Sequence, residues 1–150
     1  MVNSVKGFAL EYIRDAHPDG GEGLLAIVIR SGQSPVPGCQ FVTEPHHPLQ
    51  VAVMRHERGH VVPPHVHLER PRTYTLTQEV LVVGSGVYRV TVYTSTGRKV
   101  QDVILATGDT VVLLAGGHSV RAITDGELLE VKTGPYGGRT RSEERRVGKE

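Results

Sequence analysis

Histidine is the residue type in this chain whose number and spacing could do chemistry. Six of the eight histidines lie between positions 46 and 67, and two of them form the tripeptide His65-Val66-His67. Side chains at i and i+2 share one side of an extended segment, so both imidazoles would face the same way. Histidine is the commonest metal ligand. The pair could bind one ion if further ligands converge on it, although the same spacing also occurs where two histidines are merely exposed.

Glycines around this pair, and a later histidine, give it a context. Gly59 precedes His65 by six residues, and Glu79 precedes Gly86 by seven. An apolar run and a Gly-Gly turn lead to His118. Over residues 49–131 this arrangement resembles the two motifs of the cupin superfamily. The resemblance implies a small antiparallel β-barrel that holds a metal ion inside, with His65, His67, Glu79 and His118 as its ligands.

The carboxylate ligand has two candidates, Glu69 and Glu79. The usual cupin glutamate comes four or five residues after the second histidine, where this chain has Pro71 and Arg72. Glu69 comes earlier and Glu79 later. We favour Glu79 because it opens an expected strand and because the chain resembles a subgroup of single-domain cupins with a Thr-Gln-Glu-Val-Leu segment, a Gly-Gly-His motif and a Lys-x-Gly-Pro-Tyr ending. Residues 68–78 would then form an enlarged hairpin connection.

The implied ligand set indicates which chemistry the site could perform. Three imidazoles and one carboxylate suit Fe(II), Mn(II), Ni(II), Co(II) or Zn(II) without selecting among them. Open coordination positions would admit water or substrate, as Lewis-acid or oxygen chemistry requires. The candidates for bracing the ligands by hydrogen bonds are Gln78, Arg72 and Tyr88. The residues expected to contact substrate are His56, His60, Arg72 and Tyr88, whereas His46 and His47, between two prolines, predict an exposed turn.

Short apolar runs separated by turn residues predict an all-β fold that would position these side chains. The runs cover residues 24–30, 49–56, 79–83, 87–93, 100–105, 110–114, 120–123 and 128–132. This spacing favours an antiparallel sandwich or barrel, and the resemblance narrows it to a jelly-roll barrel of the cupin type. In residues 87–93, the face with Tyr88, Val90 and Val92 is expected to join the core. Residues 5–15 are expected to form a short helix because their apolar residues recur at helical spacing.

Three regions are expected along the chain. Residues 1–48 would form an irregular N-terminal extension that packs on the barrel, and residues 49–138 the barrel itself. Residues 139–150 hold five basic and three acidic side chains but only Val147 as a large apolar residue, which predicts a disordered tail. The string Arg-Ser-Glu-Glu-Arg-Arg-Val-Gly-Lys-Glu also resembles a translated sequencing adapter, and on that interpretation residues 141–150 are not native.

Composition excludes some classes of partner. Seventeen basic and 16 acidic side chains give a formal net charge of +1, too balanced for a nucleic-acid or membrane-surface protein. The single cysteine, Cys39, excludes an intrachain disulfide and a cysteine-based zinc cluster, and we expect it to be a small, partly buried apolar residue. The N-terminus lacks a signal-peptide pattern, and no apolar run approaches the roughly 20 residues of a membrane span. A cytoplasmic protein is therefore expected.

These features lead to one main hypothesis and two alternatives. The first is a metal-dependent enzyme of the isomerase or dioxygenase type that acts on a small molecule, with the resemblance pointing to carbohydrate or polysaccharide metabolism. The second is a non-catalytic module that binds or senses a small ligand, and the third is a structural barrel with a degenerate metal site. A metal-free sugar epimerase would need a His/Asp or His/Tyr acid–base pair, and none stands out in the sequence. The resemblance also implies a homodimer formed through edge strands, which would protect those edges.

Overall fold

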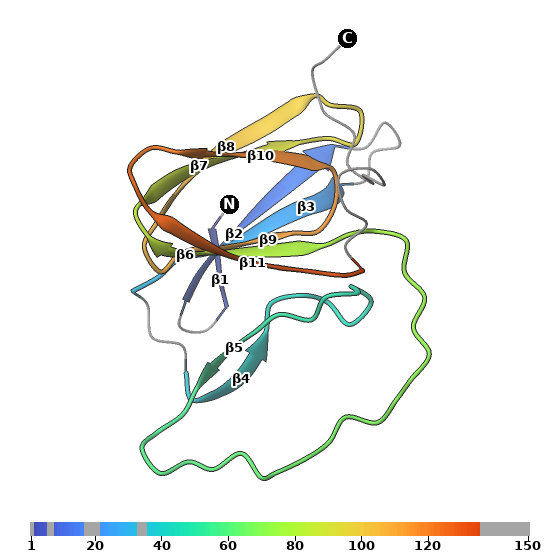
Figure 1. Cartoon of the computed structure of the whole chain (residues 1–150), viewed down its shortest axis with the longest axis vertical. Coiled ribbons are helices and arrows are strands. Elements are labelled where there is room, and N and C mark those ends of the chain that lie inside the picture. The colour runs from blue at the N-terminus through green and yellow to red at the C-terminus, as the bar shows by residue number, and fades with distance from the viewer. Residues whose placement is uncertain (1, 6–7, 17–21, 33–35, 136–150) are drawn as a thin grey trace.

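The computed structural model describes residues 2–5, 8–16, 22–32 and 36–135, and all regular structure in these ranges is β-strand (Figure 1). The strands are β1 (Val2–Val5), β2 (Phe8–Ala16), β3 (Glu22–Ile29), β4 (Gly38–Phe41), β5 (Ala52–Arg55), β6 (Glu79–Ser85), β7 (Val87–Tyr93), β8 (Lys99–Ala106), β9 (Thr110–Leu113), β10 (Gly117–Ala122) and β11 (Glu127–Lys132). Each of the predicted apolar runs overlaps one of these strands, which confirms the all-β prediction.

The strands form two main sheets and a separate two-stranded ribbon. The larger sheet has the order β1-β2-β3-β9-β6-β11, the smaller sheet has the order β10-β7-β8, and the ribbon pairs β4 with β5. Every strand pair is antiparallel. Figure 1 shows the two main sheets facing each other, the ribbon beneath the larger one, and residues 56–78 running outside both without regular structure. Within the described residues, no strand pairing joins the two main sheets into a closed barrel.

Alternation along the strands gives the larger sheet an apolar layer on each face. Leu81 and Val83 of β6 face the smaller sheet and join the main core, whereas Val80 joins a second layer on the side of the ribbon. In β7, Tyr88, Val90 and Val92 are 7%, 1% and 0% exposed, so the predicted core face is confirmed. The interior between the two main sheets is therefore the principal core.

Residues 8–16 form strand β2, so the helix predicted over residues 5–15 is wrong. Leu10 and Ile13 are both fully buried, Leu10 in the layer on the ribbon side and Ile13 in the main core. A helix with one apolar stripe could not serve both layers. Pairing with β1 on one side and β3 on the other also satisfies the backbone groups of β2. Leu10 and Tyr12 lie in the layer on the ribbon side and Ile13 in the main core, as alternation along a strand requires.

The chain before residue 49 contributes strands β1 to β4, and β3 is hydrogen-bonded to β9 inside the larger sheet. Cys39 lies exposed on β4, contrary to its expected partial burial. The ribbon directs the pair formed by Gln40 and Val53 toward the apolar layer, which leaves Cys39 and its partner Met54 on the outer side. The predicted disordered tail lies outside the described residues. The part of the chain that the structure describes has no helix with the length and apolar character of a membrane crossing.

Candidate functional site

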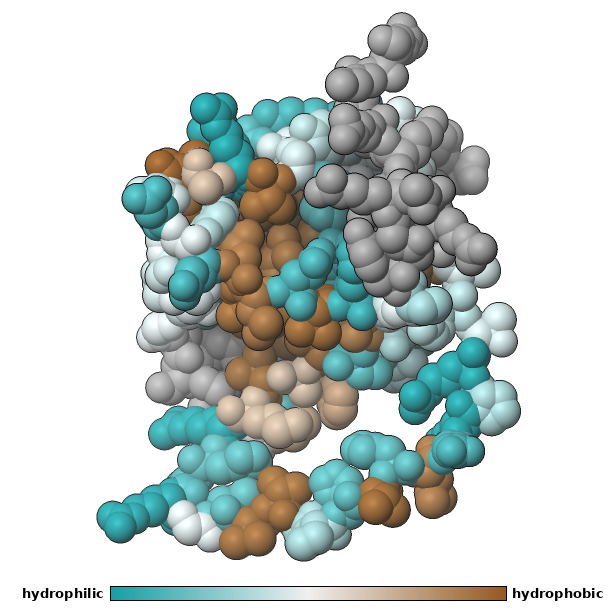
Figure 2. Space-filling view, viewed as in Figure 1, coloured by the Kyte–Doolittle hydropathy of each residue, from teal (hydrophilic) through white to brown (hydrophobic). Residues whose placement is uncertain are grey.

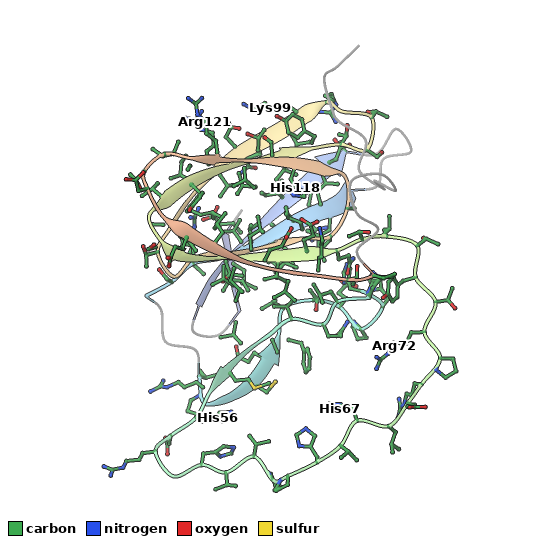
Figure 3. All side chains as sticks on the ribbon, viewed as in Figure 1. His56, His67, Arg72, Lys99, His118 and Arg121 are labelled. Carbon is green, nitrogen blue, oxygen red and sulfur yellow. The ribbon has the colours of Figure 1, made fainter. Side chains whose placement is uncertain are left out.

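Glu79 of the larger sheet and His118 of the smaller sheet contact each other between the two main sheets, with side chains that are 11% and 31% exposed. Figure 3 labels His118. Glu79 opens β6 and lies on the same face as Leu81, which belongs to the main core. His118 lies on β10 opposite the buried Val92 of β7. Because paired residues of antiparallel strands share a face, His118 is directed to the same interior as Val92. The site therefore joins residues that are far apart in the sequence and belong to different sheets.

A tight turn places His118 where the chain crosses from the larger sheet to the smaller one. Gly116 has a φ of +75°, and a Cβ atom at this position would lie 2.2 Å from the carbonyl oxygen of Tyr93. Glycine is required because it alone adopts this φ without strain and leaves room for the neighbouring strand. The chain before the turn is held by Leu114, whose N–H donates to the carbonyl oxygen of Leu25 at 2.8 Å.

The contact between the two side chains is close. His118 Nε2 lies 3.1 Å from Glu79 Oε2. Glu79 is only 8% exposed, and Oε2 is buried with no hydrogen-bond partner among the described residues. A buried carboxylate oxygen without a donated proton is costly and calls for an explanation, such as a bound ion.

Lys132 adds a positive charge on the other side of the carboxylate. It pairs with Glu79 in the β6–β11 register, and its Nζ lies 3.8 Å from Glu79 Oε1. The neighbouring imidazole of His118 lowers the pKa of the Glu79 carboxyl. Burial acts to raise this pKa but is outweighed, and the positive charge of Lys132 makes a smaller contribution that also lowers it. Glu79 is thus held in its ionised form, which is the form that accepts protons or binds cations.

Gln78 fixes the backbone beneath the site. Its buried side chain accepts a hydrogen bond from the N–H of Leu49 at 3.0 Å and donates one to the carbonyl oxygen of Leu114 at 3.2 Å. Its backbone N–H donates to Thr133 Oγ1, and its carbonyl oxygen accepts from the N–H of Thr133, both at 3.0 Å. Gln78 therefore braces the strand ends that carry Glu79 and Lys132, through backbone groups and not through the carboxylate itself.

The predicted pair His65 and His67 lies apart from Glu79 and His118. Both histidines are exposed on residues 56–78, with ring centroids 5.2 Å apart. The Nδ1 atom of His65 lies 2.9 Å from the carbonyl oxygen of Pro63. In the described ranges of the chain, no group of three or more histidine, cysteine or acidic side chains is arranged to hold a metal ion. The structure thus brings together two of the four predicted ligands, and Glu69 lies exposed on the same outer segment as the two histidines.

The residues predicted to contact substrate are dispersed. The exposed rings of His56 and His60 stack on each other with centroids 4.2 Å apart, and Tyr88 is buried in the main core. Arg72 is exposed on the outer segment (Figure 3). His46 lies in an exposed turn, as predicted, whereas His47 is half-buried and its Nδ1 accepts a hydrogen bond from the N–H of Glu44 at 3.1 Å. Lys132 is the site residue that the sequence did not reveal, because its position opposite Glu79 depends on the strand register.

Comparisons with protein-family models, with curated proteins and with solved structures find no match to this chain. The functional argument therefore depends on the geometry of Glu79 and His118.

That geometry fits two neighbouring ligands of one metal ion. Ligand atoms at about 2.0–2.2 Å from a common ion, at angles near 90–110°, lie about 3–3.5 Å from each other. The distance of 3.1 Å between His118 Nε2 and Glu79 Oε2 falls in this range. The nitrogen of a neutral imidazole and a carboxylate oxygen each carry a lone pair that can bind a cation. Imidazole nitrogen and carboxylate oxygen together suit divalent transition metals.

Proposed function

We propose that this chain is a metal-binding, cupin-like protein that acts on a small molecule, with Glu79 and His118 as two of its metal ligands. The observation that carries the proposal is the 3.1 Å contact between His118 Nε2 and a buried Glu79 oxygen that lacks a hydrogen-bond partner among the described residues. The cupin resemblance pairs the same two residues, and this agreement supports the proposal.

The other two proposed ligands, His65 and His67, would reach the site when residues 56–71 close over it, while Tyr74 stays hydrogen-bonded to Gly134. His67 precedes Arg72 by five residues, and an extended chain of that length spans up to about 17 Å. Val61, Val66 and Leu68 around the histidines are 72%, 84% and 75% exposed. Figure 2 shows apolar side chains exposed along this segment. Closure would bury them, which is favourable by about 25 cal/mol for each Å² removed from water.

Open strand edges provide a place for this segment. In the described residues, β10 pairs only with β7 and β11 only with β6, so each has an unpaired edge. Val120 faces the interior opposite Val90, yet it is 40% exposed. Unpaired edges accept an added strand. We therefore expect residues 61–68 to pair along one of these edges, which would complete a jelly-roll barrel and bring the histidine pair to the ion.

In the completed site each residue has a definite role. Glu79 and His118, with His65 and His67, would hold a divalent ion, which supplies Lewis-acid or oxygen chemistry when bound. Lys132 offsets the charge of Glu79 and keeps the carboxylate oriented at the end of β6. The main core excludes water from one side of the site and leaves the side toward residues 56–78 for the substrate. An isomerase or a dioxygenase would use such a site.

A metal-free acid–base pair is a second candidate function, favoured by the direct contact of His118 with Glu79. A carboxylate beside an imidazole can orient the ring and stabilise its protonated form, so that the ring acts as a general base. This candidate needs Nε2–H to donate to Glu79, and Oε2 has no hydrogen-bond partner among the described residues. We therefore rank it below metal binding.

Metal analysis of the full chain, purified without an affinity tag, tests the proposal. We expect about one equivalent of a divalent transition metal in the wild-type protein, and a loss of at least tenfold in affinity for Glu79→Gln and for His118→Ala. The matched controls are Glu127→Gln, at the other end of the β6–β11 ladder, and His46→Ala, in the exposed turn. Both should retain the metal.

Two results would contradict metal binding. One is a folded wild-type protein that binds no transition metal after incubation with each of the five candidate ions. The other is full retention of metal by His118→Ala. A metal-free protein whose turnover disappears in both Glu79→Gln and His118→Ala would instead support the acid–base pair.

A further inference from the structure

A pocket lies beside the end of the β6–β11 ladder that carries Glu79 and Lys132. It has a volume of about 360 Å³ and is lined by residues 72–77 together with Gly134 and Pro135. This volume is in the range of small-molecule sites, about 300–1,000 Å³. Tyr74 Oη donates a hydrogen bond to the carbonyl oxygen of Gly134 at 3.2 Å, which ties the two walls together. The pocket is therefore formed by two chain segments held against each other.

The position of the pocket relates it to the Glu79 site. Thr77 comes two residues before Glu79, and Gly134 two residues after Lys132. Between them, Gln78 and Thr133 exchange two hydrogen bonds that extend the ladder by one step. The pocket therefore adjoins the end of the ladder at which Glu79 and Lys132 pair.

The lining has the chemistry of an anion site. Arg72 forms no ion pair or hydrogen bond with another residue in the part of the chain that the structure describes. Among the residues that the structure describes, no acidic side chain lines the pocket, and the hydroxyl-bearing residues Thr73, Thr75 and Thr77 alternate along one wall. A guanidinium group binds carboxylates and phosphates through two parallel hydrogen bonds. Threonine hydroxyls both donate and accept, so they complement the hydroxyl groups of a ligand.

We propose that this pocket binds the carboxylate or phosphate group of a small polyhydroxylated molecule, with Arg72 as the anion-binding residue. On the proposed function, this molecule would be the substrate of the Glu79–His118 site. The anion would anchor one end of the substrate at Arg72. Its hydroxyl groups would contact the threonine wall and extend toward Glu79.

Titration of the full chain without added metal, followed by backbone amide shifts in NMR, tests this assignment. The probes are glucose 6-phosphate, glucuronate and neutral glucose. We expect at least one of the two anions to shift the amides of residues 73–77 and to bind at least tenfold more tightly than glucose. Arg72→Ala should weaken anion binding on the order of tenfold or more. Arg72→Lys should weaken it less, because it keeps the charge but loses the paired hydrogen bonds.

The matched control is Arg70→Ala, which removes a neighbouring exposed arginine outside the pocket. Unchanged anion binding by this variant supports the assignment, and the tighter of the two anions identifies the group recognised. Equal weakening by Arg70→Ala and Arg72→Ala would overturn it, as would equal affinity for glucose and both anions. Because the assay contains no metal, a failure to bind anions would not bear on whether the protein binds metal. A protein that binds anions but no metal would contradict only the proposed function.

Discussion

Replacing Gln78 with alanine tests whether this residue holds the strand ends beneath the site. The wild-type side chain is 1% exposed and makes two hydrogen bonds, one to the N–H of Leu49 and one to the carbonyl oxygen of Leu114. Alanine cannot form either bond. The carbonyl oxygen of Leu114 would lose its donor in a fully buried position, and the N–H of Leu49 would lose its acceptor in a partly buried one.

The expected loss of stability follows from these two groups. A buried polar group left without a partner costs about 1–3 kcal/mol, and the lower end of this range applies where water has access. Together with the space left by the missing side chain, we expect the free energy of unfolding to fall by about 2–5 kcal/mol. This is a large fraction of the roughly 5–15 kcal/mol of a typical domain. The corresponding fall in Tm is on the order of 10 °C.

Urea denaturation followed by far-UV circular dichroism is the appropriate assay, because the chain has no tryptophan. Gln50→Ala is a matched control. The exposed Gln50 side chain also donates two hydrogen bonds to carbonyl oxygens, those of Glu44 and His47, each at 2.8 Å. This control should cost about 1 kcal/mol or less, because water can replace the lost partner. Equal costs for Gln78→Ala and Gln50→Ala would refute the bracing role of Gln78.

Two other predictions concern the frame around the site. Burial acts to raise the pKa of Asp109, but hydrogen bonds from the N–H groups of Ser31 and Ala106 and from Arg30 outweigh it, so the pKa is lowered. The stabilisation is therefore complete above the unfolded pKa of about 3.9 and disappears as the pH falls through the folded value. Asp109→Asn should lower the free energy of unfolding by about 1–3 kcal/mol at pH 7. Urea unfolding at a series of pH values should also show that the variant loses less stability below pH 4 than the wild type does. Identical pH profiles for the two proteins would contradict this prediction. Gly116→Ala should destabilise the protein by more than the roughly 1–2 kcal/mol expected for Gly59→Ala. Both glycines have a positive φ, but of the two only position 116 lacks space for a Cβ atom. Equal urea midpoints for the two variants would show that the close approach to Tyr93 is unimportant.

The sequence predicted the fold best where strands have one buried and one polar face. Residues 87–93 alternate cleanly between glycine-containing turns, and β7 has these bounds. The prediction failed for β2, where Leu10 and Ile13 enter different apolar layers. It also missed β1 and β4, which lack the apolar periodicity of a strand and are defined by their pairing with β2 and β5.

Prediction of the site reached the side chains but not their arrangement. The cupin resemblance points to Glu79 and His118, and the structure places the two side chains in contact. The position of Lys132 beside Glu79 follows from the pairing of β6 with β11, which no local pattern reveals. Tyr88 is predicted both to join the core and to contact substrate. Its burial in the main core confirms the first prediction. The position of His65 and His67 depends on how residues 56–78 pack, and the Pro-rich sequence before them has no strand pattern that determines it.

Long-range ¹H–¹⁵N correlation of the eight imidazoles during a titration with Zn(II) tests the central claim most directly. The proposed metal site predicts that the signals of His65, His67 and His118 change together and saturate at one equivalent. The signals of His46 and His47 should stay unchanged at that point and serve as internal controls. An unchanged His118 signal at one equivalent, or a response confined to histidines outside the proposed set, would contradict the metal site at Glu79 and His118.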